Sequence, residues 1–164
     1  NDIEKSLLSP LQGIKQIAKE LGRSYSLVSV GIRTGDTSPY EKSKQLRNPP
    51  SILCTTPESL STALASPKFS ENLKTVKWVI VDEIHALAES KRGTHLSMSI
   101  EMLNRTAAFQ RIGLSATISP IEEIAKFLVG KGRDCTIVDS RFDKKTNIKV
   151  VSHVRDLIRS SPGN

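Results

Sequence analysis

Short apolar runs alternate with amphipathic segments along most of the chain. The apolar runs predict buried strands at residues 25–32, 51–54, 76–81, 111–114 and 135–138. Between them, apolar residues at helical spacing predict helices over residues 2–21, 38–47, 56–64, 96–103 and 121–128. Pro10 either kinks the first helix or divides it into two abutting helices. Strands that alternate with helices favour parallel pairing, and hence a three-layer α/β sandwich with a mainly parallel sheet.

Four helix starts carry the same local signal. A hydroxyl residue followed by proline suits the cap and first turn of a helix, because the hydroxyl accepts a hydrogen bond and proline lacks the unneeded N–H. We expect this arrangement at Ser9, Ser38, Thr56 and Ser119.

The run at residues 76–81 leads directly into two carboxylates and a histidine. Val79, Ile80 and Val81 are typical of a strand buried on both faces, and Asp82 and Glu83 follow at its carboxyl end. Ligands of open parallel sheets bind just beyond that end of the strands. Adjacent carboxylates there suit a magnesium ion and the activation of water beside a phosphate, although a solvated strand end would have the same sequence.

Composition narrows the setting without deciding the function. The 164 residues are enough for one domain with a sizeable core. A net charge of +7 favours a polyanionic partner, although the lysines and arginines are scattered. No apolar run approaches a membrane span, and no signal peptide is visible, so no membrane partner is expected. Cys54 and Cys135 both fall in apolar runs, which predicts buried free thiols in a reducing cytoplasm rather than a disulfide or a zinc site.

Two further strand ends place the acidic pair in a recognisable order. Thr55-Thr56-Pro57-Glu58 follows one apolar run, and Ser115-Ala116-Thr117 follows another. With Asp82-Glu83-Ile84-His85 between them, the order resembles motifs Ib, II and III of the DExH helicases of superfamily two. Stretches 33–37, 46–50 and 91–93 also resemble the Lhr type, the large helicase-related proteins. The resemblance covers roughly residues 1–151.

The resemblance implies an ATP-dependent helicase motor with a RecA-like, P-loop NTPase fold. Asp82 would then hold Mg²⁺ on the phosphates of ATP, and Glu83 would act as general base on the attacking water. His85, Ser115 and Thr117 would link hydrolysis to a second RecA-like domain. For these three residues, local hydrogen bonding and strand capping are the structural alternatives. DNA repair is an expectation from the resemblance alone.

Residues at the other strand ends are candidates for binding the backbone of single-stranded or duplex nucleic acid. The turn Arg33-Thr34-Gly35 follows one predicted strand, and Thr55 and Thr56 lie where another strand meets a helix. A helix N-terminus offers free N–H groups to an anion, and glycine allows close approach. Turns that merely join secondary-structure elements remain the alternative.

The phosphate loop that the family carries is not found within these residues. The pattern G-x-x-x-x-G-K-[ST] is missing, since the Gly-Lys pair Gly130-Lys131 is followed by Gly132. We therefore expect residues 1–140 to be a partial first RecA-like domain, incomplete at its N-terminus, and residues 141–164 to be a linker toward a second domain. A non-catalytic nucleic-acid-binding module and a structural subunit are the other hypotheses. A strand without its neighbour would favour self-association of this chain.

Overall fold

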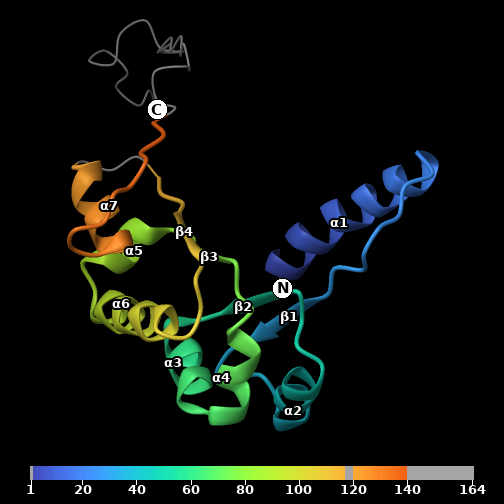
Figure 1. Cartoon of the computed structure of the whole chain (residues 1–164), viewed down its shortest axis with the longest axis horizontal. Coiled ribbons are helices and arrows are strands. Elements are labelled where there is room, and N and C mark those ends of the chain that lie inside the picture. The colour runs from blue at the N-terminus through green and yellow to red at the C-terminus, as the bar shows by residue number, and fades with distance from the viewer. Residues whose placement is uncertain (1, 117–119, 140–164) are drawn as a thin grey trace, which may run out of the picture.

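The computed structural model describes residues 2–116 and 120–139, and the statements below concern those residues (Figure 1). The predicted site residue Thr117, the predicted cap Ser119 and the expected linker 141–164 lie outside them. The elements in chain order are α1 (Asp2–Glu20), β1 (Val30–Arg33), α2 (Pro39–Arg47), β2 (Ile52–Thr55), α3 (Pro57–Ala65), α4 (Pro67–Leu73), β3 (Trp78–Val81), α5 (Ile84–Ala88), α6 (Lys91–Asn104), β4 (Gln110–Gly113) and α7 (Ile121–Val129).

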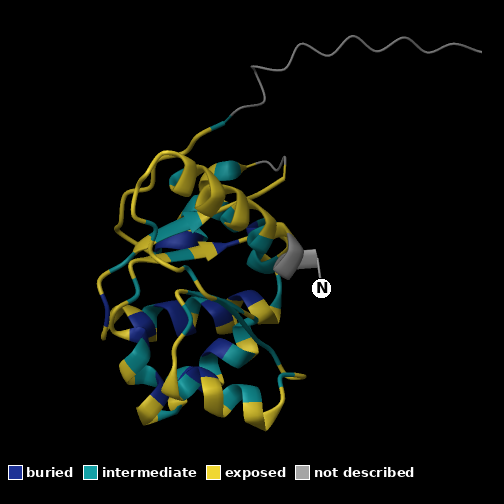
Figure 2. Cartoon of the chain, turned by 90° about the vertical axis from the view of Figure 1, so that its right-hand side faces the viewer, coloured by how far each residue is buried: buried dark blue, intermediate teal, exposed yellow. Residues whose placement is uncertain are grey.

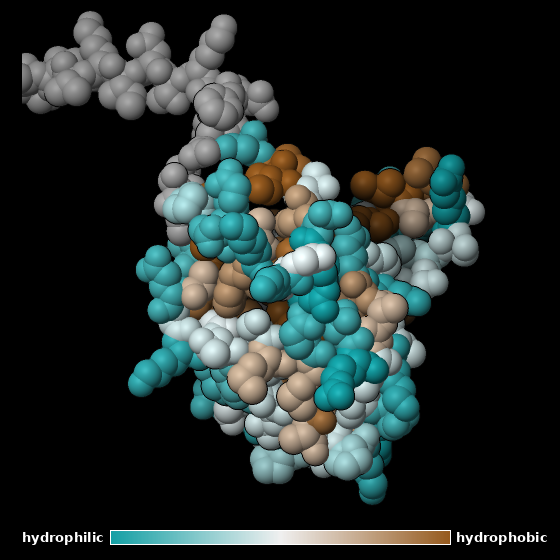
Figure 3. Space-filling model, turned by 60° about the vertical axis from the view of Figure 1, so that its left-hand side comes forward, coloured by the Kyte–Doolittle hydropathy of each residue, from teal (hydrophilic) through white to brown (hydrophobic). Residues whose placement is uncertain are grey.

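Helix α1 is one continuous helix that projects from the rest of the molecule (Figure 1). Pro10 lies inside it, so the predicted new helix start at Ser9 is wrong. Gly22 ends the helix with a φ of +62°, a conformation that glycine adopts without strain. Ile14, Ile17 and Leu21 along α1 are more than half exposed, and apolar side chains are visible on this arm at the right of Figure 3.

All strand pairing among the described residues is parallel, as predicted, but it forms two separate pairs. β1 pairs with β2 and β3 pairs with β4, each as a two-stranded sheet. The prediction of one continuous sheet is therefore wrong for the described residues. The predicted strand at 135–138 is also absent, because a strand persists only beside a partner and no described strand pairs with this segment.

The β3–β4 pair is covered by helices on one face and open on the other. Val81 is buried on the helix side, whereas Trp78 and Ile80 on the opposite face are 65% and 61% exposed. The expectation that this strand is buried on both faces is therefore wrong here. The described residues therefore hold a partial form of the predicted α/β sandwich, in which this face of the β3–β4 pair is open.

The core lies between the helices and the inner face of β3–β4 (Figure 2). Helix α3 packs on α6 through a shared apolar cluster that includes Leu60, Ala63 and Ile100. Two glycines allow close approaches beside β3 and β4. A Cβ on Gly93 would come within 1.9 Å of the Leu87 carbonyl oxygen, and one on Gly113 would come within 3.0 Å of Leu128. Helices α5, α6 and α7 are thus seated tightly beside the ends of β3 and β4.

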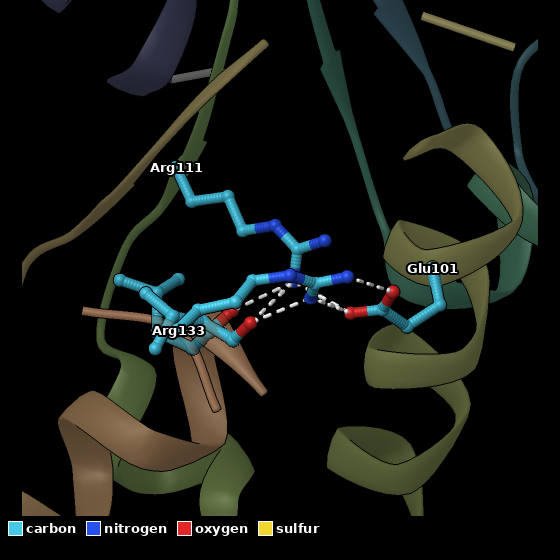
Figure 4. Close-up of polar contacts among 5 residues, drawn as sticks. Glu101, Arg111 and Arg133 are labelled. Carbon is cyan, nitrogen blue, oxygen red and sulfur yellow. Dashed lines mark hydrogen bonds and ion pairs between the residues drawn. The ribbon is translucent and has the colours of Figure 1, made fainter. Parts of the chain in front are cut away.

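A charged cluster ties α6, β4 and the end of α7 together (Figure 4). The side chain of Arg111 is only 8% exposed and donates a 2.8 Å hydrogen bond to Glu101 Oε1. Arg111 also donates to the carbonyl oxygens of Leu128 and Val129 at 3.2 and 3.3 Å, where the end of a helix attracts a cation. Arg133 binds the same carboxylate, so the single negative charge of Glu101 pairs with two guanidinium groups.

The hydrogen bonds from Arg133 and Arg111 lower the pKa of Glu101 from 4.5 to about 2. A carboxyl group with a lowered pKa stabilises the fold above its unfolded-state pKa of 4.5, and that stabilisation is lost as the pH falls toward 2. We therefore predict that Glu101→Gln lowers the free energy of unfolding by about 1–3 kcal/mol at neutral pH, the range for a buried charged donor that loses its partner. Urea unfolding at a series of pH values should show the difference from wild type shrinking between pH 4.5 and 2.

Glu123→Gln is the matched control, because it removes a surface carboxylate paired with Lys126. Its unfolding free energy should stay within about 0.5 kcal/mol of wild type, as for other exposed pairs. Parallel pH profiles for wild type and Glu101→Gln would contradict the assignment.

Candidate active site

The acidic motif lies in the turn between β3 and α5. Asp82 and Glu83 are both exposed, and Asp82 Oδ1 accepts a 2.9 Å hydrogen bond from the backbone N–H of Glu83. Glu83 adopts φ 48° and ψ 42°, the one left-handed non-glycine backbone among the described residues. Such strain persists only where the surroundings enforce it, and it is common at functional sites.

The side chains of Glu83, His85 and Ser115 form a continuous polar line. His85 Nε2 lies 3.3 Å from Glu83 Oε2, and His85 Nδ1 lies 3.2 Å from Ser115 Oγ. A neutral imidazole satisfies both contacts when Nε2–H donates to Glu83 and Ser115 donates to Nδ1. When Ser115 instead donates to the Ala116 carbonyl oxygen, at 2.9 Å, the imidazole must donate from Nδ1. In that second arrangement both contacts are hydrogen bonds only when the imidazole is protonated, because a neutral ring that donates from Nδ1 presents a lone pair to Glu83.

Backbone pairing brings these residues together although they are distant in sequence. Val81 lies opposite Gly113 in the parallel register. Beyond the strands, the N–H of Leu114 donates to the Val81 carbonyl oxygen at 2.9 Å, and the N–H of Ile84 donates to the Leu114 carbonyl oxygen at 3.0 Å. The two motif loops are thereby fastened to each other immediately beside the acidic pair.

The candidate nucleic-acid residues gather at the end of the other strand pair. Arg33 lies opposite Thr55, and Thr55 Oγ1 donates to the Arg33 carbonyl oxygen at 2.8 Å. In the following turn, the N–H of Thr34 donates to Thr37 Oγ1 at 2.8 Å. Thr56 caps α3 by accepting from the N–H of Ser59 at 3.3 Å, so its hydroxyl has the predicted capping role.

Gly35 is the residue of this group that has open space beside its backbone. A Cβ added there would meet no atom within 4 Å, and its φ is outside the left-handed region. Neither packing nor backbone geometry within the chain therefore requires glycine at this position.

Arg33 is more engaged with the protein than its sequence position suggested. Its guanidinium lies 4.3 Å from the centre of the Phe69 ring, and its Nη1 donates to Gln45 Oε1 at 3.3 Å. Burial lowers the pKa of Arg33 from its usual value. The side chain thus supports β1 and α4 as well as lying at the candidate surface.

The predicted site residues therefore form two groups rather than one rim. Asp82, Glu83, His85 and Ser115 lie at the end of β3–β4, and Arg33, Thr34, Gly35, Thr55 and Thr56 lie at the end of β1–β2. Asp82 and Ser115 share one strand end as predicted, whereas Thr55 belongs to the other pair.

The acidic turn suits a metal ion that is held partly by the protein and partly by a bound nucleotide. The exposed Asp82 carboxylate, with one oxygen fixed by the Glu83 N–H, has the chemistry of a Mg²⁺ ligand. No group of three or more His, Cys, Asp and Glu side chains within residues 2–116 and 120–139 could hold a metal ion. Mg²⁺ often takes one or two carboxylates together with phosphate oxygens and water, so the donor set fits a magnesium–nucleotide complex.

The two thiols are free, but they are less buried than the sequence suggested. Cys54 in β2 is half-buried, and burial raises the pKa of its thiol. Cys135 is exposed, so its predicted burial is wrong. No helix that the structure describes is long and apolar enough to cross a membrane.

The chain combines parallel strands, an acidic turn and a hydroxyl-bearing loop hydrogen-bonded beside that turn. Known proteins of one class share this combination. The sequence model of the DEAD/DEAH box helicases matches residues 7–126, and the chain belongs to that family. The resemblance to the Lhr type is confirmed by its relatives. The chain is 58% identical to the ATP-dependent helicase Lhr-Core of Methanocaldococcus jannaschii, over 96% of this chain and 19% of that protein. It is 45% identical to the Lhr helicase/uracil glycosylase of Escherichia coli, over 95% of this chain and 10% of that protein.

Solved structures agree with the α/β, RecA-like fold. The Mycobacterium smegmatis helicase Lhr bound to ssDNA and AMP-PNP superimposes with a TM-score of 0.75 and 47% identity, covering 79% of this chain and 17% of that one. The helicase MrfA bound to DNA and AMPPNP superimposes with a TM-score of 0.57 and 24% identity, over 77% of this chain and 18% of that one, which supports the fold alone. The chain thus spans about a fifth or less of the length of these proteins.

Proposed function

We propose that this chain supplies the hydrolysis and coupling motifs of an ATP-dependent helicase motor that moves along nucleic acid. The observation that carries the proposal is the polar line from Glu83 through His85 to Ser115 at the tip of the β3–β4 pair. A motor needs its hydrolytic carboxylate connected to a part of the protein that can respond to it, and this line provides such a connection.

In this proposal Asp82 and Glu83 divide the work at the phosphates. Asp82 would hold Mg²⁺, whose charge would supply stabilisation of the phosphate oxygens in phosphoryl transfer. Glu83 accepts the proton of the attacking water, and its exposed carboxylate is free to meet solvent and nucleotide. The contact with His85 fixes the Glu83 side chain, so that its basic oxygen has a defined direction.

His85, Ser115 and Thr117 carry the coupling step. A change in charge at Glu83 alters the preferred donor pattern of the imidazole, and Ser115 rotates its hydroxyl to match. Because Ser115 lies in the loop after β4, the adjustment reaches the surface where a second RecA-like domain would close. That domain and the phosphate loop are part of the proposal for the intact protein. So are the boundary near residue 140, the linker, a cytoplasmic location and a role in DNA repair.

The ends of β1 and β2 form the proposed nucleic-acid surface. Thr55, Thr56 and the turn at Thr34 and Gly35 offer hydroxyls, backbone N–H groups and an open approach, which suit the phosphate backbone rather than base edges. Binding that reads the backbone is independent of sequence, as a translocating motor requires. The surface extends to Arg33, whose guanidinium is partly occupied by Phe69.

We predict that Glu83→Gln in the intact protein lowers ATP turnover by about 10²–10⁴-fold, the range for loss of a general base, and leaves nucleotide binding largely in place. Phosphate release and fluorescent-nucleotide titration measure the two quantities separately. Glu89→Gln, which removes an exposed carboxylate at the end of α5, should keep wild-type turnover.

The 164-residue chain itself contains no G-x-x-x-x-G-K-[ST] and should not turn over ATP. Turnover by this chain that Glu83→Gln abolishes would contradict the prediction that hydrolysis requires the phosphate loop.

A second prediction concerns Gly35. Gly35→Val should weaken binding to single-stranded DNA by about tenfold, or 1.4 kcal/mol, because the new side chain projects into the space that a backbone would occupy. Fold stability should not change, since the position is open and unstrained. Gly13→Val is the control, because it adds the same bulk at an open position on α1. Equal affinities of Gly35→Val and wild type, measured by fluorescence anisotropy at low salt, would exclude this surface.

We further propose that the isolated chain associates with itself through the open face of β3. An exposed strand with Trp78 and Ile80 on the same face is a place where another chain can pack or pair. Sedimentation equilibrium should show association that Ile80→Lys reduces. Met98→Lys, at a 62% exposed site on α6, should not reduce it. A monomer at all concentrations would rule out this association.

A further inference from the structure

The first turns of α3 and α6 are joined by a two-point ion pair. Arg92 Nε donates to Glu58 Oε1 at 2.7 Å, and its Nη2 donates to Glu58 Oε2 at 3.3 Å. Both side chains are about half exposed, at 58% for Arg92 and 51% for Glu58. Glu58 lies one turn from Thr55 and Thr56, so the pair adjoins the proposed nucleic-acid surface.

Glu58 by itself would oppose phosphate binding at the start of α3. A carboxylate in the first turn suits the helix, but its charge repels an approaching phosphate. The hydrogen bond from Arg92, followed by backbone hydrogen bonding, lowers the pKa of Glu58 to about 2, so this carboxylate is ionised at neutral pH. Arg92 balances that charge, and the hydrogen bond with Glu58 raises the pKa of Arg92.

The pairing holds Arg92 in a fixed direction and leaves part of its guanidinium for another ligand. A guanidinium carries five N–H groups, and the fork with Glu58 uses its Nε and Nη2 atoms. Planar groups of this kind bind phosphate oxygens well once they are oriented.

The backbone beneath Arg92 is also fixed. Ser90 Oγ accepts from the N–H of Gly93 at 3.1 Å and donates to the Leu87 carbonyl oxygen at 2.8 Å. Gly93 packs against that same carbonyl group, so the start of α6 cannot shift away from α5 without losing these contacts. Packing of α3 on α6 then keeps Glu58 within reach.

We infer that Arg92, oriented by Glu58, is a further contact for the phosphate backbone of nucleic acid beside Thr55 and Thr56. This inference rests on the proposed function, because it extends the same surface. Arg92 would neutralise Glu58 and bind a phosphate at the same time. The start of α3 would then attract a phosphate instead of repelling it.

The test measures binding of the intact protein to mixed-sequence single-stranded DNA over a range of salt concentrations. Arg92→Gln should weaken binding to all sequences alike. It should also make the slope of log K against log salt shallower by about 0.7, the value for one phosphate contact on a single strand. Arg92→Lys keeps the charge and should keep the slope, with part of the affinity lost because the fork is gone. Lys74→Gln removes a cation from another exposed ion pair, with Glu71, and should leave affinity and slope unchanged.

The double variant Glu58→Gln/Arg92→Gln separates contact from charge balance. If Arg92 contacts phosphate, the double variant stays weaker than wild type and keeps the shallower slope. Recovery of wild-type affinity and slope would mean that Arg92 only neutralises Glu58, and would overturn the inference. An unchanged slope in Arg92→Gln beside normal wild-type binding would overturn it as well, while leaving the proposed function standing. Absence of binding by wild type would overturn both.

Discussion

The structure around the candidate active site depends on the parallel pairing of β3 with β4. Val81 and Gly113 end the paired region together, and two more backbone hydrogen bonds carry the contact past the strands through Leu114 to Ile84. This pairing brings the loop that carries Ser115 to the start of α5, where His85 lies within hydrogen-bonding distance. The tight seating of α5 and α7 over Gly113 then holds both loops from the helix side. A Cβ at residue 113 would lie 3.0 Å from Leu128 and 3.3 Å from Ile84, so a larger side chain there requires these side chains to shift. The geometry at the tip thus depends on the packing below it.

Local features of the fold were predictable because they depend on nearby residues. Ser38 and Thr56 cap α2 and α3 as predicted, by accepting from the backbone N–H groups of Glu41 and Ser59, and proline follows each cap. The short apolar run before Asp82 is a strand, and the acidic pair follows it. Features that depend on distant partners were not predictable. Residues 135–138 have the composition of a strand but no described neighbour, and Pro10 is tolerated inside α1 despite its usual effect on helices.

The candidate site likewise has some features that the sequence predicts and others that it does not. The residues of the polar line could be chosen from the order of the motifs, and strand register explains why they meet. The left-handed backbone of Glu83 leaves no trace in the sequence, because glutamate does not favour that conformation. Glu58 and Arg92 are 34 residues apart, and no spacing rule connects them. Arg33 could be placed at a strand end from sequence, but its stacking on Phe69 follows from how α4 folds back toward β1.

The open face of β3 also gives the molecule an optical property. Trp78 is the single tryptophan of the chain and is 65% exposed, on the opposite face of the strand from Val81 and a few residues before the acidic turn. Indole emission depends on the polarity of its surroundings, so any protein surface that covers this face will move Trp78 from water into an apolar environment. The emission spectrum of the unlabelled protein therefore reports directly on whether that side of the sheet is covered, with no other tryptophan in the chain to obscure the signal.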